Sequence, residues 1–191
     1  MYGMVNQGVA AYVKKHHGDA TWAQVLDKAG VGVGDFETML AYDDDITYKL
    51  VGSACEVLGV SGTDFLEAFG DHWVDYASDT AIGRLLSFSG DTLFEVLDNL
   101  NEMHERIQLS LPHLRPPSFE FEMGDGITHR LHYYSERDGL QPMVIGLVKG
   151  LARRCDVDVV VRIVECRIDG ADHDIFELDV TERQATGTQV A

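Results

Sequence analysis

The sequence predicts an α+β fold in which helices come first and a small antiparallel sheet follows. Apolar residues recur at helical spacing as far as Leu111, and Pro112, Pro116 and Pro117 then end helical structure. Beyond the prolines the apolar period changes to two and β-branched runs appear, as is typical of strands. At 191 residues we expect one domain over residues 1–180, with a helical subdomain at 1–111 and a sheet-containing subdomain at 112–180.

Each predicted helix rests on apolar periodicity and on residues that start or stop helices. Thr21, Thr63 and Asp91 are predicted N-caps, and the acidic run at 43–45 suits the positive end of a helix dipole. The segment 35–42 is predicted to hold one or two helical turns. The helices expected before the prolines are 3–17, 22–29, 43–58, 63–76, 80–88 and 91–107.

The second part has a β-β-α-β-β pattern. Phe and Glu alternate near Phe119, a glycine-rich turn follows, and a β-branched run near Val160 forms another strand. We expect four antiparallel strands with one helix packed on them, and a flexible tail at 181–191. The expected strands are 118–123, 127–136, 157–165 and 175–180, and the helix is 138–154.

Composition excludes several classes of function. The formal charge of −17 disfavours binding to nucleic acid and to anionic membranes, because both are polyanionic surfaces. No apolar run is long enough for a membrane span, and no signal peptide is apparent. Three cysteines without a CxxC pair suit a reducing compartment, so we expect a cytoplasmic protein.

Two features of the segment 101–137 favour a cofactor site. His104 lies on the apolar face of its predicted helix, where an imidazole is either a metal ligand or a satisfied core residue. Tyr133, Ser135 and Arg137 would share one face of a strand and suit a carboxylate or phosphate, although such residues also occur on solvated sheet faces. One axial nitrogen and one carboxylate clamp, separated by the Pro116-Pro117 step, together describe a haem site.

The chain resembles the H-NOX family, the haem nitric oxide/oxygen binding domains related to the sensor domain of soluble guanylate cyclase. The chain looks like a bacterial stand-alone relative of that sensor domain. The resemblance runs from residue 1 to about residue 180. It rests on Met1-Tyr2-Gly3, Ala68-Phe69-Gly70 with Trp73, His104, Leu114-Arg115-Pro116-Pro117, the Tyr-x-Ser-x-Arg set of Tyr133, Ser135 and Arg137, and His173-Asp174-Ile175-Phe176.

The resemblance implies a role for each site residue. His104 would be the proximal ligand of the iron of haem b, and Pro117 would press on the porphyrin and distort it. Tyr133, Ser135 and Arg137 would hold the haem propionates. The distal pocket would be formed by Val5, Val9, Trp73, Met143 and Leu147.

We expect the protein to bind NO and CO and to exclude O₂. Bound O₂ needs a distal hydrogen-bond donor, and O₂-binding relatives carry a tyrosine on the helix after the clamp, where residues 140–150 here contain none. The indole of Trp73 is the one donor that would oppose this expectation. NO should weaken the bond between iron and His104, so that the haem and its helix shift against the sheet. The resemblance implies a signalling partner such as a histidine kinase or a cyclic-di-GMP enzyme.

Two other interpretations stay open. The sequence shows no catalytic site that we recognise. Cys155, Cys166 and His173 would form a zinc or thiol redox sensor, although their spacing matches no zinc signature. A haem peroxidase would need a distal acid–base pair, for which His72 is the nearest candidate in sequence.

Overall fold

The computed structural model describes residues 1–80 and 89–183 of the chain. Its helices and strands follow one another as the sequence predicts, with helices first and the pattern β-β-α-β-β after them. The helices are α1 (Gly3–His17), α2 (Asp19–Ala29), α3 (Asp44–Leu58), α4 (Gly62–Ser78), α6 (Leu93–Asp98), α7 (Leu100–Gln108) and α8 (Gln141–Arg154), with a 3₁₀ turn η1 (Arg167–Asp169). The strands are β1 (Ser118–Glu122), β2 (Thr128–Tyr134), β3 (Val157–Glu165) and β4 (Asp174–Glu182).

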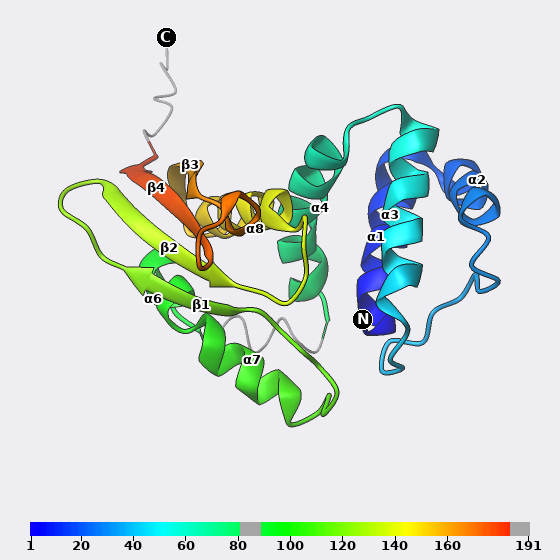
Figure 1. The fold of residues 1–191 in the computed structure, drawn as a ribbon, viewed down its shortest axis with the longest axis horizontal. Coiled ribbons are helices and arrows are strands. Elements are labelled where there is room, and N and C mark those ends of the chain that lie inside the picture. Colours follow the sequence, from blue (N-terminus) through cyan, green and yellow to red (C-terminus); the bar gives the residue numbers. More distant parts are fainter. Residues whose placement is uncertain (81–88, 184–191) are drawn as a thin grey trace, which may run out of the picture.

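The sheet is fully antiparallel, with strand order β1-β2-β4-β3. Leu131 of β2 lies between Phe121 of β1 and Phe176 of β4, and Leu131 and Phe176 are fully buried. The helix α8 packs on this face, while α6 and α7 lie against β1 (Figure 1). The α+β prediction with one helix laid on four antiparallel strands is therefore confirmed.

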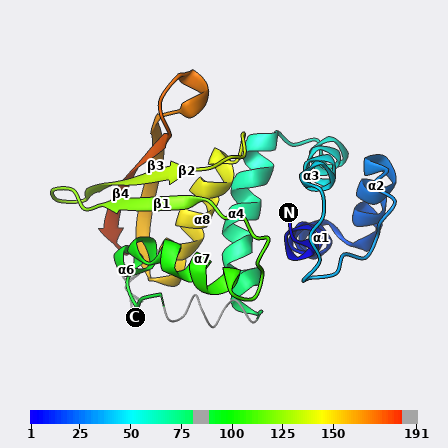
Figure 2. The same ribbon diagram turned by 60° about the horizontal axis from the view of Figure 1, so that its bottom comes forward.

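Two hydrophobic cores meet along α4. Phe65 and Phe69, in the first half of α4, pack with α1, α2 and α3, whereas Val74 packs with the sheet, α6 and α8. In Figure 2, α4 and α8 lie side by side between the sheet and the helices α1 to α3. The two cores therefore meet inside α4, and the division of the chain near Leu111 stays a prediction.

Several predicted helix boundaries are wrong for identifiable reasons. Ser61, not Thr63, caps α4, because its hydroxyl accepts a hydrogen bond from the backbone of Asp64 at 3.1 Å. Thr92, not Asp91, caps α6 and forms a capping box with Glu95. The predicted helix 91–107 is two helices, which meet at Asn99. The helix α2 begins at Asp19, ahead of the predicted cap Thr21, whose hydroxyl instead donates to the carbonyl of His17.

The segment 35–42 contains no helix. Its backbone is held by the start of α1 instead: the backbone of Gly3 donates to the carbonyl of Leu40 at 2.8 Å, and Tyr2 forms an isolated bridge with Ala41. Phe36 is buried in the N-terminal core. Tertiary contacts therefore override the local helical pattern here. Of the predicted helix 80–88, residues 81–88 lie outside the described residues.

The second half of the chain also differs at element ends. The strand β2 ends at Tyr134, so Ser135 lies beyond the strand, and α8 starts at Gln141 with Pro142 in its first turn. The strand β4 continues to Glu182, which places the first residues of the predicted tail in the sheet. No helix in the described ranges 1–80 and 89–183 is long and apolar enough to cross a membrane.

The contact between α4 and α8 depends on glycines. A Cβ on Gly70 would lie 2.2 Å from the carbonyl oxygen of Met143, and one on Gly146 would lie 1.9 Å from the carbonyl oxygen of Glu67. Both distances are far shorter than van der Waals contact, so the two helix backbones touch at these positions. This close approach fixes Met143 and its neighbours on α8 relative to Trp73 on α4.

We therefore expect Gly146→Ala to destabilise the protein by about 2–3 kcal/mol or more, because the helices must move apart. Gly52→Ala is the matched control: Gly52 is exposed on α3 with open space around it, so alanine should stabilise by about 0.5–1 kcal/mol. Urea denaturation of both variants measures the difference. Equal stability of the two variants would contradict the packing described here.

Candidate cofactor cavity

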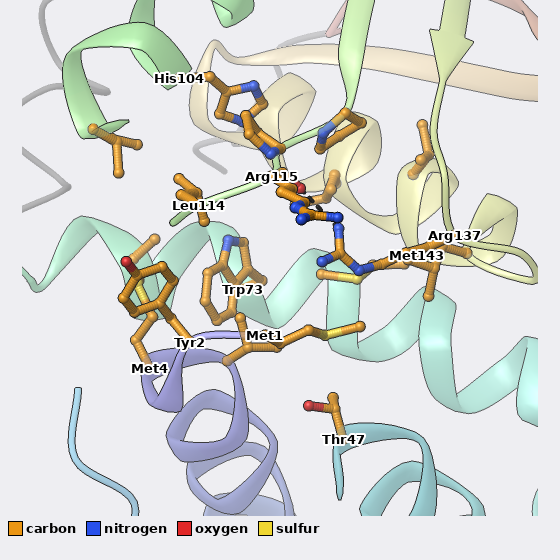
Figure 3. A pocket seen from close by; sticks show the side chains of 18 of the residues that line it. Met1, Tyr2, Met4, Thr47, Trp73, His104, Leu114, Arg115, Arg137 and Met143 are labelled. Carbon is orange, nitrogen blue, oxygen red and sulfur yellow. Dashed lines mark hydrogen bonds between the residues drawn. The ribbon is translucent and has the colours of Figure 1, made fainter. Parts of the chain in front are cut away.

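A cavity of about 670 Å³ lies where α1, α4, α7 and α8 converge (Figure 3). Its volume is within the range of small-molecule and cofactor sites, about 300–1,000 Å³. Most of the wall is apolar, and the charged groups lie at one rim. The described residues that α1, α4 and α8 contribute are Met4, Val5, Leu66, Phe69, Trp73, Val74, Ala77, Met143, Val144, Leu147, Val148 and Leu151.

His104 projects from α7 into this cavity (Figure 3). Its Nδ1 is buried and has no hydrogen-bond partner among the described residues. Burial lowers the pKa of His104 to about 4, and an opposing interaction with the backbone of Pro117 offsets only part of that effect. The imidazole is therefore neutral at pH 7, which is the protonation state that a metal ion requires.

The helix carrying His104 is tied to the sheet by one side chain. The amide of Asn101 donates to the carbonyl of Phe119 at 2.6 Å, and the backbone N–H of Phe119 donates to the Asn101 oxygen at 2.9 Å. The ring centroids of His104 and Phe119 are 6.1 Å apart. Pro117, two residues before Phe119, lines the same cavity. Sequence reasoning missed Asn101, because nothing in its helix distinguishes it from a solvent-facing polar residue.

The three predicted clamp residues lie together but do not share a strand face. Tyr133 is buried in β2, where burial raises its pKa. Ser135 follows the strand, and its hydroxyl accepts a hydrogen bond from the backbone of Arg137 at 3.0 Å. All three line a smaller cleft of about 460 Å³, and Arg137 also lines the main cavity. The turn after β2, and not the strand period, brings them together.

Arg137 is held by the first half of the chain. Its Nε donates to Asp44 at 2.7 Å, and its Nη1 donates to the carbonyl of Arg115 at 2.7 Å. The N-terminal ammonium of Met1 pairs with the other oxygen of Asp44 and donates to the carbonyl of Tyr42 at 2.6 Å. Burial alone would raise the pKa of Asp44, but the ammonium and Arg137 hold it below its usual range.

Asp44 is a site residue that the sequence does not mark. It stands in an acidic run whose local role is to start α3, and the hydrogen bond from the backbone of Asp45 to Asp43 fills that role. A residue 93 positions from Arg137 can be identified as its partner only from the fold.

Four of the five predicted distal residues line the cavity: Val5, Trp73, Met143 and Leu147. The structure does not place Val9 on the wall; it is fully buried in the N-terminal core with Phe65 and Phe69. Val9 is one helical turn beyond Val5, and the aromatic side chains of α4 separate it from the cavity. Among the described lining residues of α1, α4 and α8, Trp73 alone carries a side-chain hydrogen-bond donor.

The structure does not assemble the residues of the zinc alternative. All three cysteines are free thiols, and no cluster of three or more His, Cys, Asp or Glu side chains that could bind a metal occurs within residues 1–80 and 89–183. Cys155 ends α8, whereas Cys166 lies beyond β3, where the Gln141 amide donates to its sulfur at 3.9 Å.

His72 does not provide the distal base of a peroxidase. It is buried on α4 and faces Tyr12 and His16 of α1, with ring centroids 5.5 Å and 5.7 Å away. It is not among the lining residues of the cavity. Desolvation by burial lowers the pKa of His72, so this imidazole is also neutral at pH 7.

The cavity residues fit a haem by their chemistry. A neutral imidazole reaches an apolar, cofactor-sized space, and a guanidinium stands at its rim, where a carboxylate would be paired. His104 would hold the iron, and Arg137, Ser135 and Tyr133 would hold the propionates.

Comparison with known proteins shows the family of the chain. The family model described as Haem-NO-binding matches residues 2–163. The soluble guanylate cyclases gcy-35 and gcy-37 of Caenorhabditis elegans are 30% and 32% identical to this chain over 93% and 100% of its length. The chain spans only about a quarter of those relatives, 26% and 28% of their lengths.

Solved structures share the fold. A variant of an H-NOX protein from S. oneidensis in the Fe(II) ligation state superposes with a TM-score of 0.87 at 18% identity, covering 96% of this chain and 98% of that one. The Fe(II)NO state of an H-NOX protein from S. oneidensis gives 0.85 at 18% identity, with 95% and 100% covered. An unliganded Fe(II) H-NOX protein from K. algicida gives 0.81 at 17% identity, with 98% and 100% covered.

The low pKa of His104 predicts acid sensitivity of the haem-free protein. The folded state binds fewer protons than the unfolded state, in which histidine titrates near 6.5. Stability is therefore fully present above about pH 6.5 and falls as the pH drops toward 4, by on the order of 3 kcal/mol for His104. Denaturation of wild type and His104→Gln from pH 7 to pH 4 should show a shallower pH slope for the variant. His17→Gln, at an exposed histidine that is not among the lining residues of the cavity, is the control and should keep the wild-type slope.

Proposed function

Because this chain belongs to the Haem-NO-binding family, we propose that it is a haem-based gas sensor that binds haem b through His104. The observation that carries the proposal is the neutral imidazole facing an apolar cavity, with Arg137 at the rim. When bound, haem supplies a ferrous iron that takes NO or CO as a ligand. The chain holds it, orients it and decides which gas is retained.

The apolar distal wall supports selection of NO and CO over O₂. Bound O₂ draws negative charge from the iron and gains most from a hydrogen-bond donor, whereas NO and CO depend on one much less. In the described lining, α8 offers Met143, Val144 and Leu147, none of which can donate. Among the described lining residues of α1, α4 and α8, Trp73 is the only one with a side-chain donor, and its helix is held against α8 at Gly70.

The contacts of α7 support a signalling route through the sheet. Any displacement of His104 moves α7, and the paired hydrogen bonds of Asn101 carry that displacement to Phe119 in β1. At its other end α7 contacts the start of α1, because Ile107 and Leu111 pack with Tyr2 and Met4. A partner that contacts either region would detect the change.

The longer relatives support the proposal that this domain regulates a signalling protein. The guanylate cyclases are about four times longer than this chain, so most of their length lies outside the part that matches it. We propose that this domain regulates a separate or attached signalling protein, such as a histidine kinase or a cyclic-di-GMP enzyme. We assign no catalytic reaction to the cavity residues.

Replacement of His104 tests the proposal directly. Purified wild type with haem supplied should show a Soret band that shifts with NO and CO under argon, and His104→Gly should lose it. Added imidazole should restore the band in the variant, because it replaces the missing ligand. His17→Gly is the control, since this exposed histidine ends α1 and is not among the described residues that line the cavity. A colour and gas response that persist in His104→Gly without imidazole would refute the assignment.

Insertion of a distal donor tests gas selection. Leu147→Tyr should raise O₂ affinity about 10- to 100-fold, the effect of one hydrogen bond to a charged acceptor. Leu147→Phe adds the same ring without the hydroxyl and should leave O₂ binding weak. Spectra in air and under NO measure both. A stable oxygen complex of the wild-type protein would exclude the proposed selectivity while leaving haem binding intact.

A further inference from the structure

The two edges of the sheet differ in how they are protected. At the β1 edge, the side chain of Asn101 occupies both the N–H and the carbonyl of Phe119, and α6 and α7 lie against the strand. An exposed edge strand presents unpaired backbone groups that can pair with another chain. Asn101 therefore satisfies the outer backbone groups of one residue of this edge as it positions α7.

The β3 edge has no such protection from the described residues. The nine-residue strand β3 pairs only with β4, and α8 packs on one face of it (Figure 1). No side chain in ranges 1–80 and 89–183 donates to or accepts from the outer backbone of β3. In Figure 2 the end of β3 and the turn η1 extend beyond the rest of the sheet.

The residues of β3 are unusually apolar for an exposed edge. Val160 is 55% exposed, Val164 is 46% exposed and Ile163 is 41% exposed. The strand carries three charged residues, Asp158, Arg162 and the terminal Glu165, and the side chains of the first two are 59% and 48% exposed. A long, β-branched edge with few charges favours addition of another strand.

We propose that β3 pairs antiparallel with β3 of a second copy of this chain, across a two-fold axis at Val160. This register places Asp158 opposite Arg162 of the second copy, twice, on the solvent face. On the face covered by α8 it places Val157 opposite Ile163 and Val159 opposite Val161. Within residues 157–163 every cross-strand pair is then apolar with apolar or acid with base.

Neighbouring registers lack this complementarity. An axis at Val161 places Arg162 opposite Val160, and Asp158 opposite Val164, so both charge pairs are lost. An axis at Val159 places Asp158 opposite Val160 and Arg162 opposite Asp156, which precedes the strand and is already paired with Arg183. The self-complementary charge pattern therefore favours a second copy as the occupant of this edge over an unrelated strand.

The ion pairs already formed within one copy leave donor groups of Arg162 free for the proposed pair with Asp158 of the second copy. Arg162 contacts Glu177 and Asp179 of β4 through its Nη2 alone, which leaves its Nη1 and Nε for Asp158 of the second copy. Asp158 accepts from Arg183 at 3.2 Å through one carboxylate oxygen. The opposing force is the charge of −17 on each copy, which salt screens over about 8 Å at physiological ionic strength.

Sedimentation of the full chain at about 0.15 M salt, from about 1 µM to about 1 mM, tests the proposal. Wild type should form dimers as its concentration rises, and Val160→Lys should be monomeric throughout. Met123→Lys, at a residue 61% exposed before the β1–β2 turn, is the matched control and should dimerise as wild type does. A wild-type monomer at every concentration, or a dimer that survives Val160→Lys, overturns the proposal.

A charge-reversal mixture tests the register. Asp158→Arg and Arg162→Asp should each weaken self-association at least about tenfold, because each homodimer then opposes like charges. An equimolar mixture of the two variants should form a heterodimer, since both contacts are again acid with base. Circular dichroism verifies that each variant folds. Failure of the mixture to associate better than either folded variant alone overturns the register.

Discussion

The neutral imidazole of His104 is the constraint on which the candidate site depends. An ionisable ring in an apolar cavity must either be deprotonated or become exposed to solvent. Burial here lowers the pKa of His104 to about 4. Its Nδ1 has no hydrogen-bond partner among the described residues. Such a group costs stability in the absence of a ligand, so the fold carries it at a position where a metal-bound cofactor would compensate.

The rest of the cavity follows from two close contacts between segments far apart in sequence. Gly70 and Gly146 let α4 and α8 touch, which builds the proposed distal wall, where Trp73 is the one polar side chain among the described lining residues of α4 and α8. Asp44 and Arg137 join the start of α3 to the turn after β2, which fixes the charged rim. One contact sets the polarity of the wall and the other sets where a carboxylate would be bound.

Sequence reasoning predicted most helices and strands and the motif residues, but not the contacts between them. The apolar face of α7 and the Tyr-x-Ser-x-Arg spacing indicated His104 and Arg137, because both signals are local. Asp44 acts across 93 positions and resembles an ordinary helix start, so no local pattern marks it. The residues 35–42 show the same limit: their helical pattern is real, but hydrogen bonds from the start of α1 determine their conformation.

Asn101 connects the site to the sheet in two ways. Its hydrogen bonds to Phe119 satisfy the outer backbone of β1, and the same bonds attach the helix of His104 to that strand. A movement of α7 away from β1 would therefore break this attachment and expose backbone groups at a sheet edge. Because the unpaired edge at β3 lies on the opposite side of the sheet, the two edges are separate surfaces. Gas-dependent change at β1 and strand pairing at β3 can then occur in the same molecule without competing for the same backbone.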